Sequence, residues 1–325
     1  MHHPIKNWQQ ELTEGFSDIA ELYRYLNLPI DQSTATYTFP LRVPRSFVNR
    51  MEKANINDPL LKQVLPISKE TLEATGFSND PVGDINAITA PGIIHKYQGR
   101  VLFITTGSCA INCRYCFRRN FPYSEFQLST KKIQQALQYV QNNQDISEVI
   151  LSGGDPLLLN DQKLFSLFQK IEQIEHVKRI RIHSRIPIVL PSRIDTDFCE
   201  QLSNINKPIV IVIHSNHQNE LNDEVQVACN KMTLRKITLL NQAVLLKNIN
   251  DSAEQLCALS EKLFTFGVLP YYLHLLDRAH GTKHFEVKQA TAIRLMDQVK
   301  KQLPGYLVPK LVREQAGADN KIIIA

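Results

Sequence analysis

From residue 101 onward, short apolar runs alternate with amphipathic stretches. The runs have the length and composition of buried strands, and they lie at Val101–Thr105, Glu148–Leu151, Arg179–His183, Pro208–Ile213, Ile237–Leu240 and Tyr271–Leu275. Helical patterns lie between several of them, at Thr130–Asn142, Gln162–Ile174 and Ala253–Phe266. Strands and helices that alternate about every 30 residues indicate successive βαβ units around a parallel sheet. Six units predict an α/β fold, an incomplete (β/α)6 barrel with all strand carboxyl ends on one face.

The first hundred residues have a helical pattern instead. Apolar side chains recur at three- and four-residue steps at Trp8, Leu12, Phe16, Ile19, Tyr23 and Leu26. This stripe predicts one amphipathic helix that ends before Pro29. A second helix is expected at Arg45–Lys53, and Phe77–Gly92, with its prolines and glycines, is expected to be an irregular connector. We therefore divide the chain into an N-terminal helical segment (1–92), a partial barrel (93–305) and a C-terminal segment (306–325).

Composition and charge narrow the class of protein. With 325 residues, 43% of them hydrophobic, the chain is long enough to bury a large core. The net charge of +5 comes without a dense run of Lys or Arg, so nucleic-acid binding is not expected. No apolar stretch approaches the roughly 20 residues of a membrane span, and the first residues lack the apolar core of a secretory signal. We therefore expect no membrane partner and a cytoplasmic location.

Three cysteines spaced CxxxCxxC are the strongest chemical signal in the chain. Cys109, Cys113 and Cys116 follow the predicted strand Val101–Thr105, where a barrel places its reactive loops. Three thiolates on one loop can each bind one iron of a cubane [4Fe–4S] cluster, which leaves the fourth iron open for a small molecule. A zinc loop, a disulfide with a spare thiol, or chance are the alternatives. The other cysteines have no paired spacing and are expected to be buried apolar residues: Cys199, Cys229 and Cys257.

This loop, with Tyr115 before its last cysteine, resembles the signature of the radical S-adenosylmethionine (SAM) enzymes. In that superfamily the open iron binds SAM, which is cleaved to a 5′-deoxyadenosyl radical. Gly153, Gly154 and Asp155 follow the next strand, and they resemble the element that holds the amino group of SAM. Gln242 stands beside Asn241 inside an apolar run, where a buried amide needs hydrogen-bond partners. Either a ligand or the core itself supplies these partners.

The order of several motifs is similar to that of the lysine 2,3-aminomutases, over essentially the whole chain. These motifs are His95–Arg100, Cys113–Arg119, Leu151–Pro156, Leu240–Gln242 and Leu276-Asp277 with His284-Phe285. Further details resemble the branch that supplies (R)-β-lysine for modification of elongation factor P; they lie at Leu41–Phe47, Arg118–Tyr123, Pro270–His274 and Gly305–Lys310.

The resemblance implies two cofactors besides the cluster, namely SAM and pyridoxal 5′-phosphate (PLP). Lys321 corresponds to the catalytic lysine that carries PLP, and Arg100 to the arginine that holds the PLP phosphate, with Tyr97 as an aromatic beside it. His214 and Gln242 correspond to positions near SAM.

The resemblance also implies a substrate site for L-lysine. Arg118 corresponds to the arginine that pairs with the substrate carboxylate, and Asp277 to a carboxylate that receives the ε-ammonium group. Glu314 is expected to share that task, although the dedicated lysine mutases have an aspartate there. A second departure is Ile322 after Lys321, where the family commonly has threonine and proline.

The implied reaction is radical migration of the amino group of L-lysine from Cα to Cβ, which gives (R)-β-lysine. The resemblance also implies a reductant such as flavodoxin or ferredoxin. It further implies a functional link to elongation factor P and its lysyl ligase. Two alternatives stay open: an aminomutase for another amino acid, such as glutamate or arginine, and a non-catalytic iron–sulfur protein. The acidic pair Asp277 and Glu314 argues against an acidic substrate.

Overall fold

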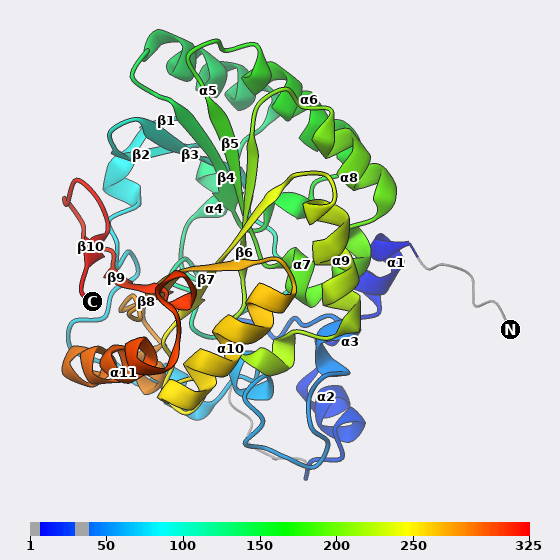
Figure 1. Cartoon of the computed structure of the whole chain (residues 1–325), viewed down its shortest axis with the longest axis vertical. Helices are drawn as coiled ribbons and strands as arrows, with labels where there is room; N and C mark the ends of the chain where they lie inside the picture. Colours follow the sequence, from blue (N-terminus) through cyan, green and yellow to red (C-terminus); the bar gives the residue numbers. More distant parts are fainter. Residues whose placement is uncertain (1–6, 30–38) are drawn as a thin grey trace, which may run out of the picture.

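The structure is a computed structural model that describes residues 7–29 and 39–325. A ten-stranded sheet runs in chain order from β1 to β10 and curls around the centre of the molecule (Figure 1). Its wall consists of parallel strands β3 (Arg100–Thr106), β4 (Glu148–Gly153), β5 (Arg179–Ser184), β6 (Ile209–His214), β7 (Thr238–Val244) and β8 (Leu269–His274). The predicted incomplete barrel is therefore confirmed, with strand bounds shifted by a few residues.

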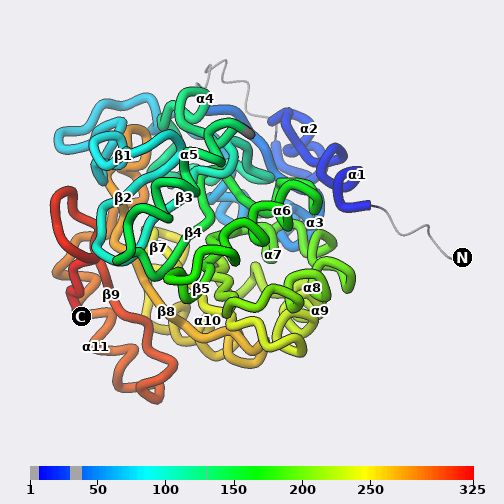
Figure 2. Tube along the Cα trace, turned by 90° about the horizontal axis from the view of Figure 1, so that it is seen from above, coloured from blue at the N-terminus to red at the C-terminus, as the bar shows by residue number. Residues whose placement is uncertain are grey.

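Helices cover the outside of this wall, as Figures 1 and 2 show. They are α5 (Thr130–Asn142), α6 (Asp161–Glu172), α8 (Thr196–Ser203), α9 (Asp223–Thr233), α10 (Ala253–Thr265) and α11 (Gln289–Gln302), with the short α4 (Tyr123–Phe126) and α7 (Ile186–Val189) near strand ends. The first five each begin after a side chain that caps a backbone N–H of the first turn, namely Ser129, Asn160, Asp195, Asn222 and Ser252. Their apolar faces and the strands form one continuous core.

The sheet extends beyond the six predicted strands at both edges. At one edge, β1 (Ile88–Ala90) and β2 (Ile93–Tyr97) form antiparallel pairs that lead into β3. At the other, β9 (Lys310–Arg313) lies parallel to β8 and β10 (Ile322–Ile323) turns back along β9. The expected connector at Phe77–Gly92 thus contains a strand and the short helix η3 (Ile85–Ala87). Among residues 7–29 and 39–325 no ladder joins the two edges, and the backbone crosses this side only at an isolated bridge between Ser78 and Ala279.

The N-terminal stripe forms two helices rather than the single predicted one. These are α1 (Trp8–Thr13) and α2 (Ile19–Tyr25). The break occurs because the backbone of Phe16 pairs with that of Val43 in both directions, at 2.8 and 3.0 Å, and Asp18 then caps α2. The helix expected at Arg45–Lys53 also ends early, since α3 spans only Arg45–Val48. Tertiary pairing overrides the periodic pattern here.

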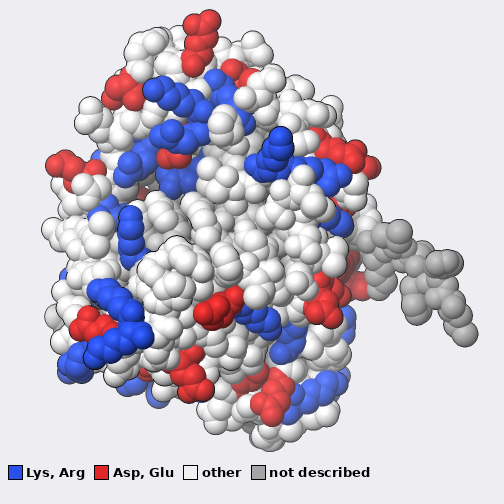
Figure 3. Space-filling view, in the orientation of Figure 1, with Lys and Arg blue, Asp and Glu red and all other residues white. Residues whose placement is uncertain are grey.

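The exterior carries charges of both signs. Figure 3 shows Lys and Arg interspersed with Asp and Glu on the face that it presents. Over residues 7–29 and 39–325, the structure contains no helix with the length and apolar character required to traverse a lipid bilayer. The six cysteines are all free thiols.

Candidate active site

A cavity of about 410 Å³ occupies the inside of the barrel. It extends from the cysteine loop at the carboxyl ends of the strands to Arg100, the first residue of β3. All the residues proposed from the sequence line it: Tyr97, Arg100, Cys109, Cys113, Cys116, Arg118, Gly153, Gly154, Asp155, His214, Gln242, Asp277, Glu314 and Lys321. The fold therefore brings together side chains that are more than 200 residues apart in the chain, as between Cys109 and Lys321.

The three cysteines of the loop face this cavity together. Burial raises the pKa of the Cys116 thiol to about 11, and the neighbouring Cys113 thiol adds to the rise. Burial likewise raises the pKa of Cys109, with Cys116 as the next cause. Thiols with raised pKa values need a strong electrophile, such as iron, to ionise. Among the described residues, no three His, Cys, Asp or Glu side chains are arranged around a single metal ion, whereas a cubane separates its ligands because each binds its own iron.

A buried ion cluster fastens the cysteine loop to the N-terminal segment. The carboxylate of Glu70 accepts hydrogen bonds from Arg114 Nε at 2.8 Å and Nη2 at 2.5 Å, and from Arg119 Nη2 at 2.8 Å. Both guanidinium groups lie over the ring of Phe39, and the Arg114 backbone N–H donates to Gln63 O. Arg114 and Arg119, next to Cys113 and after Cys116, are therefore anchored to the N-terminal segment, while the cysteines themselves line the cavity.

The cysteine loop requires the glycine pair Gly153-Gly154 at the end of β4. A Cβ on Gly154 would lie 2.2 Å from the carbonyl oxygen of Ser108, and one on Gly153, whose φ is +113°, would lie 2.7 Å from Thr106 O. At this approach the Gly154 N–H donates to Thr106 O and the Asp155 N–H to Ser108 O. The sequence suggested that these glycines admit a ligand, and the structure shows that they admit the loop backbone.

Asp155 supports the end of β5. Its carboxylate accepts hydrogen bonds from Ser184 Oγ at 2.7 Å and from the backbone N–H groups of Arg185, Leu157 and Ile186. Burial raises its pKa to about 6, and these hydrogen bonds oppose the rise. Both oxygens have protein partners, so the geometry gives Asp155 a positioning role at the end of β5.

Two polar side chains from β6 and β7 lie near the cysteine loop. His214 stands opposite Gln242 in the strand register, and both line the cavity. The ring of His214 packs edge-on against Tyr115, and its buried Nε2 atom has no partner among the described residues. Burial lowers the pKa of His214 to about 3, with the charge of Arg185 as the next cause, so the imidazole is neutral. Asn241 instead exchanges hydrogen bonds with the backbone of Ser215, as a satisfied core amide.

A chain of alternating charges closes the open side of the barrel. Arg118 Nε lies 2.6 Å from Asp84, and Asp84 lies 2.6 Å from Lys96 Nζ on β2. Lys96 Nζ lies 3.0 Å from Glu314, which follows β9, and Glu314 pairs in turn with Lys321. Burial alone would raise the pKa of Glu314, but the charges of Lys321 and Lys96 outweigh burial and lower it. This chain connects the cysteine loop to the lysine proposed to carry PLP.

The part of the cavity near Lys321 contains several buried polar atoms without partners in the described chain. They are the Tyr97 hydroxyl and the Nε2 atoms of His183 and His274. Burial lowers the pKa of both histidines well below its usual value, and the charge of Lys321 contributes. Arg100 lies near by, with its guanidinium 4.7 Å from the ring centroid of Tyr97. Buried polar groups without partners normally have a ligand or water to satisfy them.

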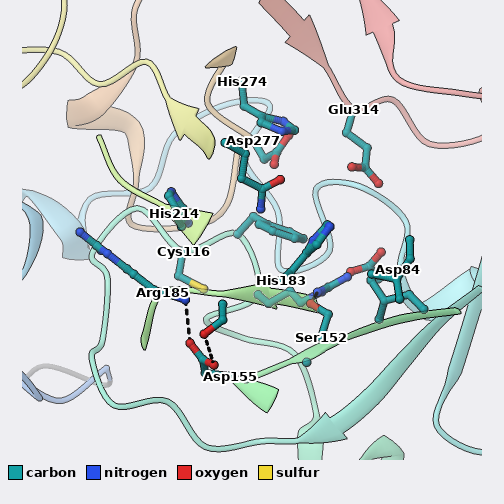
Figure 4. A pocket seen from close by; sticks show the side chains of 18 of the residues that line it. Asp84, Cys116, Ser152, Asp155, His183, Arg185, His214, His274, Asp277 and Glu314 are labelled. Carbon is teal, nitrogen blue, oxygen red and sulfur yellow. Dashed lines mark hydrogen bonds and ion pairs between the residues drawn. The ribbon is translucent and has the colours of Figure 1, made fainter. Parts of the chain in front are cut away.

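Asp84, Glu148 and Glu314 each pair with a cation in this cavity, whereas in the described chain no cation pairs with Asp277. Burial raises its pKa to about 7, and repulsion from Glu314 adds to the rise. Figure 4 shows Asp277, His274 and Glu314 on the side of the cavity opposite Asp155 and Ser152. A bound cation beside Asp277 would remove this electrostatic penalty.

Sequence reasoning missed three residues of this site. Lys96 lies inside the motif His95–Arg100 but received no role, and Asp84 lies in the expected connector. Arg185 follows a strand-like run, and the structure places its Nη1 atom 2.7 Å from Cys113 Sγ. A charged residue at the carboxyl end of a barrel strand was the available signal for Arg185.

Comparison with known proteins supports a single family. The sequence pattern of the Radical SAM superfamily matches residues 103–251. The chain is 46% identical to the L-lysine 2,3-aminomutase of Haemophilus influenzae, over 98% of this chain and 96% of that protein. It is 44% identical to the L-lysine 2,3-aminomutase of Escherichia coli K12, over 97% of this chain and 94% of that protein.

The chain belongs to the L-lysine 2,3-aminomutase family. The resemblance inferred from the motifs is confirmed, and so is the expectation of an enzyme, a radical SAM isomerase. Membership of the superfamily implies a [4Fe–4S] cluster and SAM. The donor set fits these groups, since three thiols and the partnerless Nε2 atom of His214 face one cavity.

Gly154→Ala tests the link between the glycine pair and the cysteine loop. We expect the variant to retain several-fold less iron after anaerobic reconstitution and to lose about 1–3 kcal/mol of unfolding free energy, because the added Cβ overlaps the Ser108 backbone. Gly305→Ala is the matched control, since nothing lies within 4 Å of its added Cβ. Iron analysis and urea unfolding give the answer, and wild-type values for Gly154→Ala would contradict this packing argument.

Proposed function

We propose that the protein converts L-lysine to (R)-β-lysine, with PLP as a second cofactor beside the cluster and SAM. The observation that carries the proposal is that Cys109, Cys113, Cys116 and Lys321 line the same cavity. Lysine is the residue type that attaches PLP, and Arg100 with the Tyr97 hydroxyl offers donors for its phosphate. The relatives named L-lysine 2,3-aminomutase support this substrate.

When bound, the three groups supply an organic radical and an electron-delocalising ring, and the protein fixes the substrate between them. We propose Arg118 as the partner of the substrate carboxylate. Asp84 holds the Nε side of this guanidinium, while its Nη1 atom makes only a long contact, 3.3 Å, to Ser152 Oγ. A guanidinium fork that is held on one side can offer its other edge to a carboxylate.

At the other end of the substrate, we propose that Asp277 receives the ε-ammonium group. Glu314 is already paired with Lys96 and Lys321, whereas Asp277 has no such cation among the described residues. The ammonium group of a lysine substrate therefore has its strongest electrostatic attraction beside Asp277, where it also stabilises the ionised carboxylate. Glu314 contributes negative charge at the same end and keeps acidic substrates away.

The free thiols and an oxygen-sensitive cluster suit a reducing cytoplasm. We propose a small reductant such as flavodoxin or ferredoxin as the electron donor. The link to elongation factor P and its lysyl ligase rests on the motifs of that branch at Leu41–Phe47 and Pro270–His274.

Incubation of the reconstituted protein with SAM, dithionite and L-lysine tests the proposed function. We expect β-lysine, detected by chiral chromatography and mass spectrometry, and no β-amino product from glutamate or arginine. Production of 5′-deoxyadenosine without β-lysine would instead indicate another substrate. The absence of any SAM cleavage by protein that contains the cluster would favour a non-catalytic iron–sulfur protein.

The pH dependence of lysine binding tests the role of Asp277. Because the pKa of Asp277 is about 7 and its ionised form binds the ammonium, the KM for lysine should rise up to tenfold per pH unit as the pH falls below about 7. Asp277→Asn should raise the KM roughly 10- to 100-fold at pH 8, or about 1.4–2.8 kcal/mol, and remove this dependence.

Asp145→Asn is the control for this measurement, because Asp145 is exposed in the turn that precedes β4. Steady-state rates between pH 6 and pH 8.5 give KM for the wild type and both variants. An Asp277→Asn variant with the wild-type pH profile and KM would exclude the assigned role.

A further inference from the structure

Arg185 places a buried positive charge against one of the three loop cysteines. It directly follows β5, and its Nη1 atom lies 2.7 Å from Cys113 Sγ. Only 5% of its side chain is exposed. The mechanism proposed above assigns no role to this residue, although a buried guanidinium is costly unless its donors are used.

The guanidinium of Arg185 is fixed on several sides. Its Nη2 atom donates to Gln63 Oε1 at 2.8 Å and to Glu220 Oε2 at 3.2 Å. The rings of Phe47 and Tyr115 lie 5.3 and 5.6 Å from its central carbon. These contacts leave Nη1 directed at the sulfur of Cys113 without rotamer freedom.

The partner carboxylate of Arg185 is fixed as firmly. Glu220 is fully buried, and its Oε1 atom accepts hydrogen bonds from Gln63 Nε2 and from the backbone N–H groups of Asn216 and His217. Asn216 also donates to the Tyr115 hydroxyl at 2.7 Å. A polar layer behind the loop thus balances the charge of Arg185 and holds it in place.

We propose that Arg185 is a positioning residue that donates a charge-assisted hydrogen bond to the Cys113 thiolate and thereby tunes the reduction potential of the cluster. The inference rests on the proposed ligation of the cluster by Cys113. A donor at a ligand sulfur withdraws electron density and stabilises the reduced, more negative cluster, so it raises the potential. Glu220 partly offsets this effect because its negative charge lies on the other side of the guanidinium.

The test compares Arg185→Met/Glu220→Gln with Glu220→Gln alone. The double variant removes the buried charges together, so neither remains unpaired, while Glu220→Gln retains the guanidinium beside Cys113. Iron and sulfide contents and the midpoint potential from an anaerobic titration followed by electron paramagnetic resonance are the readouts. We expect a full cluster with a lower potential in the double variant, and a potential not below wild type in Glu220→Gln.

An unchanged potential in the double variant overturns the inference, and so does an equal decrease in Glu220→Gln. If the double variant holds no cluster, the midpoint potential of Arg185→Lys tests the inference instead. This variant retains the buried charge but lacks the guanidinium fork that reaches Gln63, Glu220 and Cys113 together. A lower potential in Arg185→Lys supports the inference and a wild-type potential refutes it. Wild-type protein without iron and sulfide would instead refute the proposed function itself.

Discussion

The alternating charges that connect Arg118 to Lys321 hold the site together. In the described chain no strand ladder joins β1 to β10, and the backbone crosses the open side only where Ser78 pairs with Arg278 and His280, so side chains supply the other contacts between the two edges. Lys96 does this, because it contacts Asp84 on its own side and Glu314 on the other. Each charged side chain in this series has a neighbour of opposite charge. Removal of one partner typically lowers the free energy of unfolding by about 3–5 kcal/mol when the remaining charge is buried.

The same chain separates the cavity into two chemical environments. At the cysteine loop, buried thiols and a neutral histidine face each other, as expected where a cluster and SAM bind. At Lys321, cationic and carboxylate groups alternate, and Asp277 has no paired cation in the described part of the chain. A substrate with a carboxylate at one end and an ammonium at the other matches the proposed roles of Arg118 and Asp277. Lysine has this distribution of charge.

The sequence predicted much of this arrangement and missed identifiable parts of it. Periodicity located the barrel strands and helices because long elements such as α5 carry a strong repeat. Strands β9 and β10 were missed because two to four residues carry no period. The break at Phe16 was missed because it depends on pairing with Val43.

Motif reasoning identified the residues of the cavity but not the groups that hold them. Cys113 was predictable from its spacing. Its contact with Arg185 depends on how the loop after β3 lies against the end of β5 in three dimensions. Asp155 was expected to contact a cofactor, and its hydrogen bonds to Ser184 and to the backbone at the end of β5 were not predicted. Such supporting contacts arise only when distant segments meet, so a single sequence does not reveal them.

The most direct test is the site of PLP attachment in protein that also carries the cluster. Anaerobically reconstituted wild type and Lys321→Ala would be incubated with PLP, reduced with borohydride and analysed by peptide mass spectrometry and iron assay, with exposed Lys310→Ala as the control. The account predicts iron in all three proteins and a pyridoxyl group on Lys321 in the wild type and the control only. A pyridoxyl group on Lys96, the other lysine of the cavity, or stoichiometric zinc in place of iron, would contradict it.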